Sequence, residues 1–98
     1  MEFNIFVFII DEVRSCENGF LVVGRMKNGE LKSGEEVHLV AKDADPKVVR
    51  CEHILKNNRE IVRARKGESL VLTLSGVAEQ DVRKGMYLST PNYRVRFD

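Results

Sequence analysis

Residues 24–37 read Gly24-Arg25-Met26-Lys27-Asn28-Gly29-Glu30-Leu31-Lys32-Ser33-Gly34-Glu35-Glu36-Val37, so turn residues alternate with apolar ones along this segment. Asn28-Gly29 offers the two positive-φ positions of a type I′ turn, and Ser33-Gly34 marks a second reversal a few residues later. Strands between such close reversals must be short and antiparallel. The segment therefore predicts β-hairpins.

The same extended pattern continues on both sides. Apolar residues recur with a period of two along most of the chain, and β-branched residues are common, which indicates strands. Leu70, Leu72 and Leu74 form the most regular alternating row, so we expect them in the core. The turn residues 43–46 include Pro46, which breaks the pattern. The expected strands are residues 3–13, 20–27, 35–41, 47–55, 61–65, 70–75, 86–89 and 93–97, with one helical turn within 77–84.

The length and spacing of these segments predict an all-β fold. A chain of 98 residues can bury one core, so residues 1–98 are expected to form a single domain. Short strands with turn signals about every 8 to 12 residues are typical of a small β-barrel. Closing the sheet also removes the unpaired edges of an open one.

Composition excludes several classes of protein. The chain is 43% hydrophobic and 32% charged, which suits a globular domain. The longest apolar segment, residues 3–10, is far shorter than the roughly 20 residues of a membrane-spanning helix, so we expect a cytoplasmic protein. Cys16 and Cys51 are too few and too isolated for a disulfide scaffold or a zinc site. His38 and His53 show no catalytic spacing, and we expect neither enzymatic activity nor a cofactor.

Five short motifs follow one another along the chain. They are Gly24-Arg25, Gly29-Glu30-Leu31-Lys32-Ser33-Gly34-Glu35-Glu36-Val37, Ala64 with Gly67-Glu68, Leu72 with Leu74-Ser75-Gly76, and Asp81 with Gly85-Met86-Tyr87-Leu88. In this order they resemble the second domain of translational GTPases such as elongation factor Tu, and the resemblance covers about residues 6–90. The resemblance implies a closed six-stranded antiparallel barrel, to which residues 93–97 would add an extra C-terminal strand.

The resemblance also sets expectations about function. This chain lacks the Gly-x-x-x-x-Gly-Lys-Ser/Thr loop that cradles phosphates, so we expect no GTP binding by it. In elongation factor Tu the domain helps to hold the aminoacylated end of transfer RNA. At the matching positions this chain keeps an acidic pair, Asp11-Glu12, but has Arg14 for an aromatic residue, Val23 for threonine and Ser69 for asparagine. These changes argue against aminoacyl-transfer-RNA binding.

One candidate surface is the first strand, which is apolar on both faces. A barrel wall buries one face only, so the other needs cover. Either residues 93–97 fold over it, or Phe6, Phe8 and Ile10 form an outer patch that binds a protein or a second copy of the chain.

A second candidate surface is basic. Between Lys47 and Lys66 there are seven bases and two acids, although the whole chain carries only +1. Arg59, Arg63, Arg65 and Lys66 could contact RNA phosphates, and no aromatic residue lies nearby for base stacking.

We therefore expect a non-catalytic, stand-alone barrel of translation-factor type that serves as a protein-interaction or assembly module, docking on a GTPase or a ribosome-associated factor. The alternative is an RNA-binding module that uses the basic surface. Salt dependence separates these two hypotheses, because apolar docking survives high salt and phosphate contacts do not.

Overall fold

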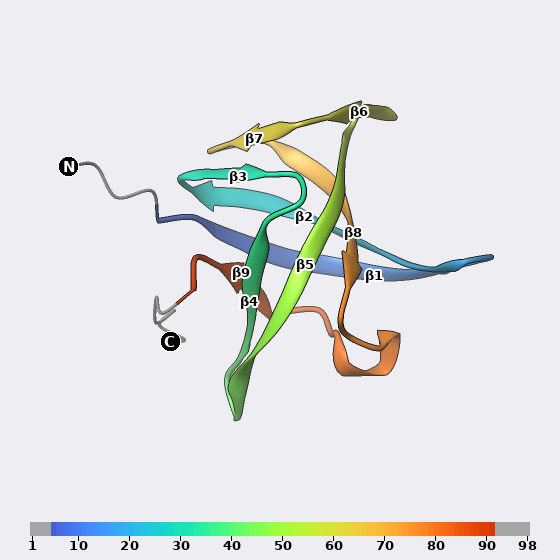
Figure 1. The fold of residues 1–98 in the computed structure, drawn as a ribbon, viewed down its shortest axis with the longest axis vertical. Coiled ribbons are helices and arrows are strands. Elements are labelled where there is room, and N and C mark those ends of the chain that lie inside the picture. Colours follow the sequence, from blue (N-terminus) through green and yellow to red (C-terminus); the bar gives the residue numbers. More distant parts are fainter. Residues whose placement is uncertain (1–4, 92–98) are drawn as a thin grey trace.

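The computed structural model describes residues 5–91 as a small β-barrel (Figure 1). Its elements in chain order are β1 (Val7–Cys16), β2 (Gly19–Asn28), β3 (Glu30–Lys32), β4 (Glu36–Ala41), β5 (Ala44–Lys56), β6 (Arg59–Ile61), β7 (Arg63–Arg65), β8 (Ser69–Ser75), the 3₁₀ turn η1 (Glu79–Asp81) and β9 (Tyr87–Ser89). The expected helical turn within residues 77–84 is confirmed as η1. The expected strand at residues 93–97 lies outside the described residues.

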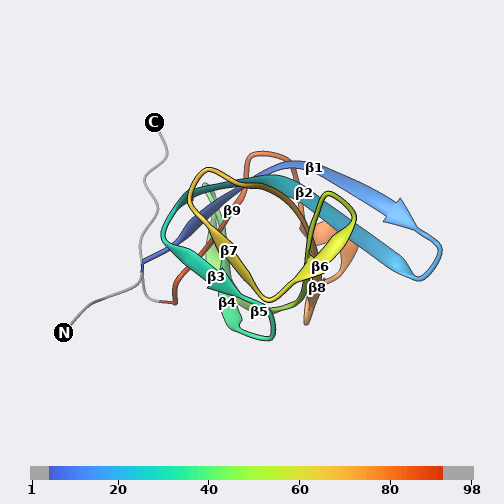
Figure 2. The same ribbon diagram turned by 90° about the horizontal axis from the view of Figure 1, so that it is seen from above.

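Six antiparallel strands close into the barrel (Figure 2). Their order around the ring is β1, β2, β8, β5, β4 and β9, and β9 pairs again with β1. β6 extends the sheet beside β5, while β3 and β7 form a separate two-stranded sheet. The predicted all-β, closed six-stranded antiparallel barrel is therefore confirmed.

Side chains that alternate between the two faces of each strand fill the interior of the barrel. Leu70 and Leu72 are buried as expected, and Leu74 packs against the core. Leu88 of β9 lies between Phe8 of β1 and Leu39 of β4 in the same cross-strand row. Because side chains of adjacent strands in one row point to the same side, this row fills the core from three strands at once.

Three local expectations are wrong. Gly29 has a positive φ of 67°, but Asn28 does not, and β3 pairs with β7 and not with β2. The pair of positive-φ residues that a type I′ turn requires is instead Asn57 and Asn58, which join β5 to β6. Long-range pairing of β3 thus overrides the local hairpin signal.

The second and third errors concern strand boundaries. β5 begins at Ala44 and runs through Pro46, although proline has no backbone N–H to donate. The ladder with β4 shifts register at this point, so no hydrogen-bond donor is needed there. The expected strand at residues 61–65 is divided at Val62, whose carbonyl accepts a hydrogen bond from the Ser33 amide at 3.0 Å. β6 and β7 consequently pair with different neighbours, β5 and β3.

Candidate nucleic-acid interface

Within residues 5–91, the barrel interior is filled mainly by apolar side chains. The buried residues are almost all apolar, and burial raises the pKa of the Cys51 thiol to about 12. His53 pairs with Glu60 at 3.1 Å on the outer surface and makes no contact with His38. Within residues 5–91, no group of three or more His, Cys, Asp and Glu side chains could hold a metal ion. In the same part of the chain, no helix combines the length and apolarity that crossing a membrane requires.

The proposed apolar docking residues lie inside the barrel, so that expectation is corrected. Phe6, Phe8 and Ile10 are at most 2% exposed and belong to the core. The opposite face of β1, with the half-buried Val7 and Ile9, is the outer one. Sequence alternation identified two faces correctly but could not say which one the closed sheet turns inward.

Two of the predicted RNA-contacting residues, Arg63 and Arg65, stand on the exposed face of β7. Between them Ala64 is buried, so both guanidinium groups point outward. On β3, Lys32 is the cross-strand partner of Arg63, and Glu30 is that of Arg65. The Glu30 carboxylate lies 3.8 Å from the Nε atoms of both arginines. One acid therefore faces three bases on this small sheet.

Lys66 follows β7 in the turn that reaches back to β2. The Gly67 amide donates to the Met26 carbonyl at 2.8 Å, and the Met26 amide donates to the Glu68 carbonyl at 2.9 Å. Beside these bonds lies a surface hollow of about 230 Å³, which is lined by Lys27, Lys66 and Arg25. Arg25 forms an ion pair with Asp11, and the Nε atom of Arg25 lies 3.0 Å from the Oδ2 atom of Asp11.

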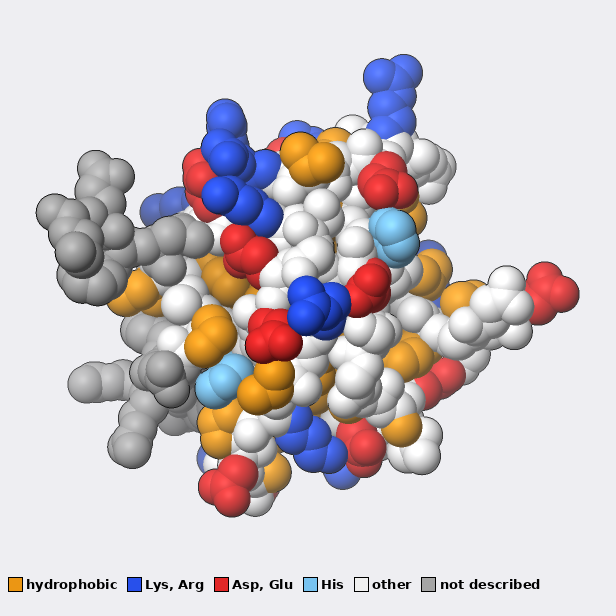
Figure 3. All heavy atoms as spheres, in the orientation of Figure 1, with side chains coloured by type: hydrophobic (Ala, Val, Ile, Leu, Met, Phe, Trp, Pro, Cys, Tyr) orange, Lys and Arg blue, Asp and Glu red, His pale blue; other side chains and the backbone are white. Residues whose placement is uncertain are grey.

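The basic surface is thus larger than the sequence window suggested. We use this name for Lys27, Lys32, Arg63, Arg65 and Lys66, which come from β2, β3, β7 and their turns. Figure 3 shows Lys and Arg side chains gathered at the upper end of the molecule, where β3 and β7 lie. Lys27 and Lys32 were missed because they are distant in sequence from residues 59–66. The signal that could have found them is the pair of bases flanking Gly29, once β3 is known to pair with β7.

Glu68 is a second acid beside this surface, and its carboxylate is held mainly by Lys56. The Lys56 ammonium and the Arg65 backbone amide both donate to it, and these hydrogen bonds hold the pKa of Glu68 below its usual value. Two acids, Glu30 and Glu68, therefore lie beside the five bases of the basic surface.

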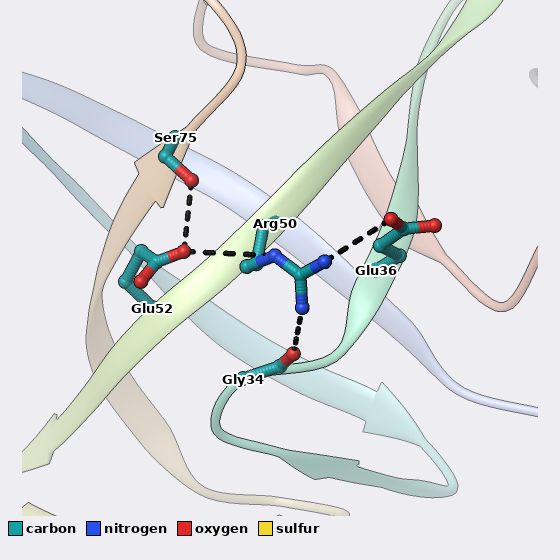
Figure 4. Close-up of polar contacts among 5 residues, drawn as sticks. All are labelled: Gly34, Glu36, Arg50, Glu52 and Ser75. Atoms are coloured by element: carbon teal, nitrogen blue, oxygen red, sulfur yellow. Dashed lines mark hydrogen bonds and ion pairs between the residues drawn. The ribbon is translucent and has the colours of Figure 1, made fainter.

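The predicted RNA contact Arg59 does not join the basic surface, and neither does Arg50, another base of the segment 47–66. Arg59 lies at the start of β6, next to the β5–β6 turn and apart from β7 (Figure 1). Arg50 of β5 is bound into a polar network across the barrel wall (Figure 4). Its guanidinium donates to the Gly34 carbonyl at 2.6 Å and to Glu36 at 3.1 Å, and it lies 3.8 Å from Glu52, which accepts from Ser75.

The acidic residues Asp11 and Glu12 are also engaged in ion pairs. Asp11 binds Arg25, and Glu12 binds Arg14 at 3.0 Å, which lowers the pKa of Glu12. Arg14, at the position of a family aromatic, is thus engaged with a neighbour on the same strand. Whether the changes at Val23 and Ser69 abolish aminoacyl-transfer-RNA binding stays a prediction.

A comparison with known protein families agrees with this architecture. Residues 19–89 match the family described as Elongation factor Tu domain 2. The match begins with β2, ends with β9 and includes every strand of the basic surface. It covers well over half of the chain. The chain therefore belongs to the elongation factor Tu domain 2 family.

Proposed function

We propose that this translation-factor-like module binds the phosphate backbone of structured RNA through the basic surface. The observation that carries the proposal is that five bases from β2, β3, β7 and their turns lie on one surface, where Glu30 is 3.8 Å from Arg63 and Arg65 and where Lys27 and Lys66 line one hollow. Guanidinium and ammonium groups spaced along such a surface bind phosphate oxygens and release counterions. The proposal concerns binding alone and assigns no catalytic role to these residues.

Backbone recognition suits this surface better than base recognition. Within residues 5–91, the aromatic side chains are Phe6 and Phe8, which are buried, and Phe20 and Tyr87, which are half-buried and lie outside the basic surface. Single-stranded RNA is usually held by stacking its bases on exposed aromatic rings. The expected ligand is therefore an RNA whose phosphates are presented by its fold.

The apolar docking hypothesis is weaker in comparison. Its residues Phe6, Phe8 and Ile10 are unavailable to a partner. The described large hydrophobic side chains that are well exposed are Ile5, Val48 and Val62, which come from different segments. Scattered single hydrophobic residues are ordinary on a protein surface and do not indicate docking.

The test is fluorescence anisotropy of a labelled RNA hairpin titrated with the 98-residue chain. About four phosphate contacts give a slope of about −3 for log affinity against log salt. Raising salt from about 50 to about 200 mM should then weaken binding about 60-fold. Lys66→Glu should weaken binding about tenfold at the lower salt, because a contact becomes a repulsion.

The matched control is Lys42→Glu, which changes the net charge equally but lies at the β4–β5 turn, at the other end of the barrel (Figure 1). This variant should bind the hairpin within about twofold of the parent chain. Equal losses in the two variants would show non-specific attraction and refute the proposal. Absence of binding up to about 100 µM protein at the lower salt would refute it as well.

A further inference from the structure

The strand β1 has one edge that is paired for only part of its length. β9 pairs with Val7–Ile9, and the last bonds on this side join Ile10 to Met86 and Gly85 at 3.0 and 2.9 Å. Beyond them, residues 11–16 pair with β2 alone among the described strands. In an antiparallel strand every second residue directs its N–H and C=O away from the paired neighbour. This edge therefore carries backbone groups without a strand partner.

A groove runs along that edge. Its volume is about 560 Å³, and it is lined by Asp11, Glu12 and Val13 of β1, by Val23 of β2, and by the loop residues Val82, Arg83 and Lys84. One end is closed by the bonds of Ile10, and near the other end the Ser15 hydroxyl donates to the Glu79 carboxylate of η1. In Figure 1 the loop that follows η1 passes below β1. On the β1 side the lining spans three residues, 11–13, a length of about 10 Å in an extended strand.

The charges along the groove are unbalanced. Its acids, Asp11 and Glu12, are paired with Arg25 and Arg14. Within residues 5–91, the side chains of Arg83 and Lys84 have no acidic partner, and both residues are exposed. Two free cations beside two neutralised acids attract an anionic ligand.

The apolar part of the lining sets a further requirement. Val82 is buried, and Val13 and Val23 are half-buried. A ligand that fills the groove must therefore present small apolar groups on one side and acids toward Arg83 and Lys84. Period-two alternation of an extended peptide places its side chains in this way.

We propose that residues 11–15 of β1 and the loop 82–84 form a docking groove for an extended acidic peptide segment of a protein partner, which adds a strand to the free edge of β1. Main-chain hydrogen bonds to the edge supply affinity, and the cations and the valines select the side chains. This site is separate from the basic surface, so RNA binding can fail while this proposal holds.

The test uses a fluorescein-labelled hexapeptide that alternates Glu and Val, titrated at about 0.1 M salt, where only near charges act. The double variant Arg83→Glu, Lys84→Glu should bind it at least tenfold more weakly. The control variant Arg59→Glu, at the β5–β6 turn, should keep its affinity within about twofold. A peptide with Lys in place of Glu should bind at least tenfold more weakly to the parent chain.

Two measurements address the strand pairing itself. N-methylation of alternate peptide amides removes hydrogen-bond donors and should weaken binding at least tenfold. Hydrogen exchange of the amides in residues 11–15 should slow at least tenfold in the complex. The proposal is overturned by equal binding of the methylated peptide, by protection confined to other strands, or by a failure to bind up to about 1 mM. A dimer of the chain that the peptide cannot dissociate would also overturn it, since a second copy would then occupy the edge.

Discussion

Replacing Gly24 with alanine should test how closely β1 and β2 approach in the barrel wall. An ideal Cβ on Gly24 would stand 1.9 Å from the Ile9 carbonyl oxygen and 2.7 Å from Cζ of Phe8. Gly24 does not have a positive φ, so the cost of the substitution is steric and not conformational. The obstacle nearest to the new atom is backbone, which cannot rotate away as a side chain can.

The size of the effect follows from these distances. An ordinary contact of about 3.4 Å requires the Ile9 carbonyl to withdraw by about 1.5 Å. Such a movement breaks about two ladder hydrogen bonds between β1 and β2, at about 1 kcal/mol each, in addition to about 1–3 kcal/mol of overpacking. We therefore expect Gly24→Ala to lower the free energy of unfolding by about 3–5 kcal/mol. A domain of this size has about 5–15 kcal/mol in total.

Urea unfolding followed by circular dichroism measures this effect. At an m-value of about 1–1.5 kcal/mol per M, the midpoint should fall by about 2–5 M. The control is Gly85→Ala, where φ is 94° but no atom lies within 4 Å of the new Cβ, so that only about 1 kcal/mol of backbone strain is expected.

A second substitution distinguishes the two obstacles. Phe8→Leu removes the aromatic ring but leaves the Ile9 carbonyl in place, so most of the loss caused by Gly24→Ala should remain. Because the two residues are in contact, we expect a coupling energy between them, but one below about 1.5 kcal/mol. A rescue of more than about 1.5 kcal/mol would refute the backbone explanation, because the ring alone would then be the obstacle. A loss below about 1 kcal/mol for Gly24→Ala by itself would refute the close approach.

Three further outcomes are expected. Glu68→Gln should destabilise the chain by about 1 kcal/mol at pH 7, because the ion pair with Lys56 needs a carboxylate. The pKa of Glu68 is lowered in the folded state, so this difference should vanish as the pH falls through the folded-state pKa. Urea unfolding at pH 7 and at low pH would measure both effects. At pH 8 an aromatic disulfide reagent should titrate one thiol, the exposed Cys16, and should reach Cys51 only after denaturation, since that thiol is buried and its pKa is raised to about 12. Phe8→Lys should abolish the folded circular dichroism spectrum, because it places a charge in the core; a folded variant would contradict the inward orientation of Phe8.

Sequence patterns predicted the fold well because each relied on local physical rules. The period-two rows of β8 and the glycine-marked reversals depend on the geometry of a single strand or turn. They are confirmed by the buried Leu70 and Leu72 and by the reversals at Gly34 and Gly67. The division of residues 61–65 was not predictable, because it results from a hydrogen bond between Ser33 and Val62, which are far apart in sequence.

The candidate surfaces were harder to predict than the fold. The alternation of β1 shows that Phe6, Phe8 and Ile10 share one face, but the inward face depends on how the ring closes. The basic surface was found in part, because Arg63 and Arg65 are close in sequence. Its other half required the pairing of β3 with β7.

By itself the sequence determined that this chain is a small all-β barrel, since period-two alternation and turn residues act over a few neighbouring positions. Its motifs also indicated the resemblance to the second domain of elongation factor Tu. Only the tertiary structure decided which face of β1 is inside, which bases gather at one end and where β1 keeps a free edge. Those features arise when strands distant in sequence are brought into register, and no local pattern records that register.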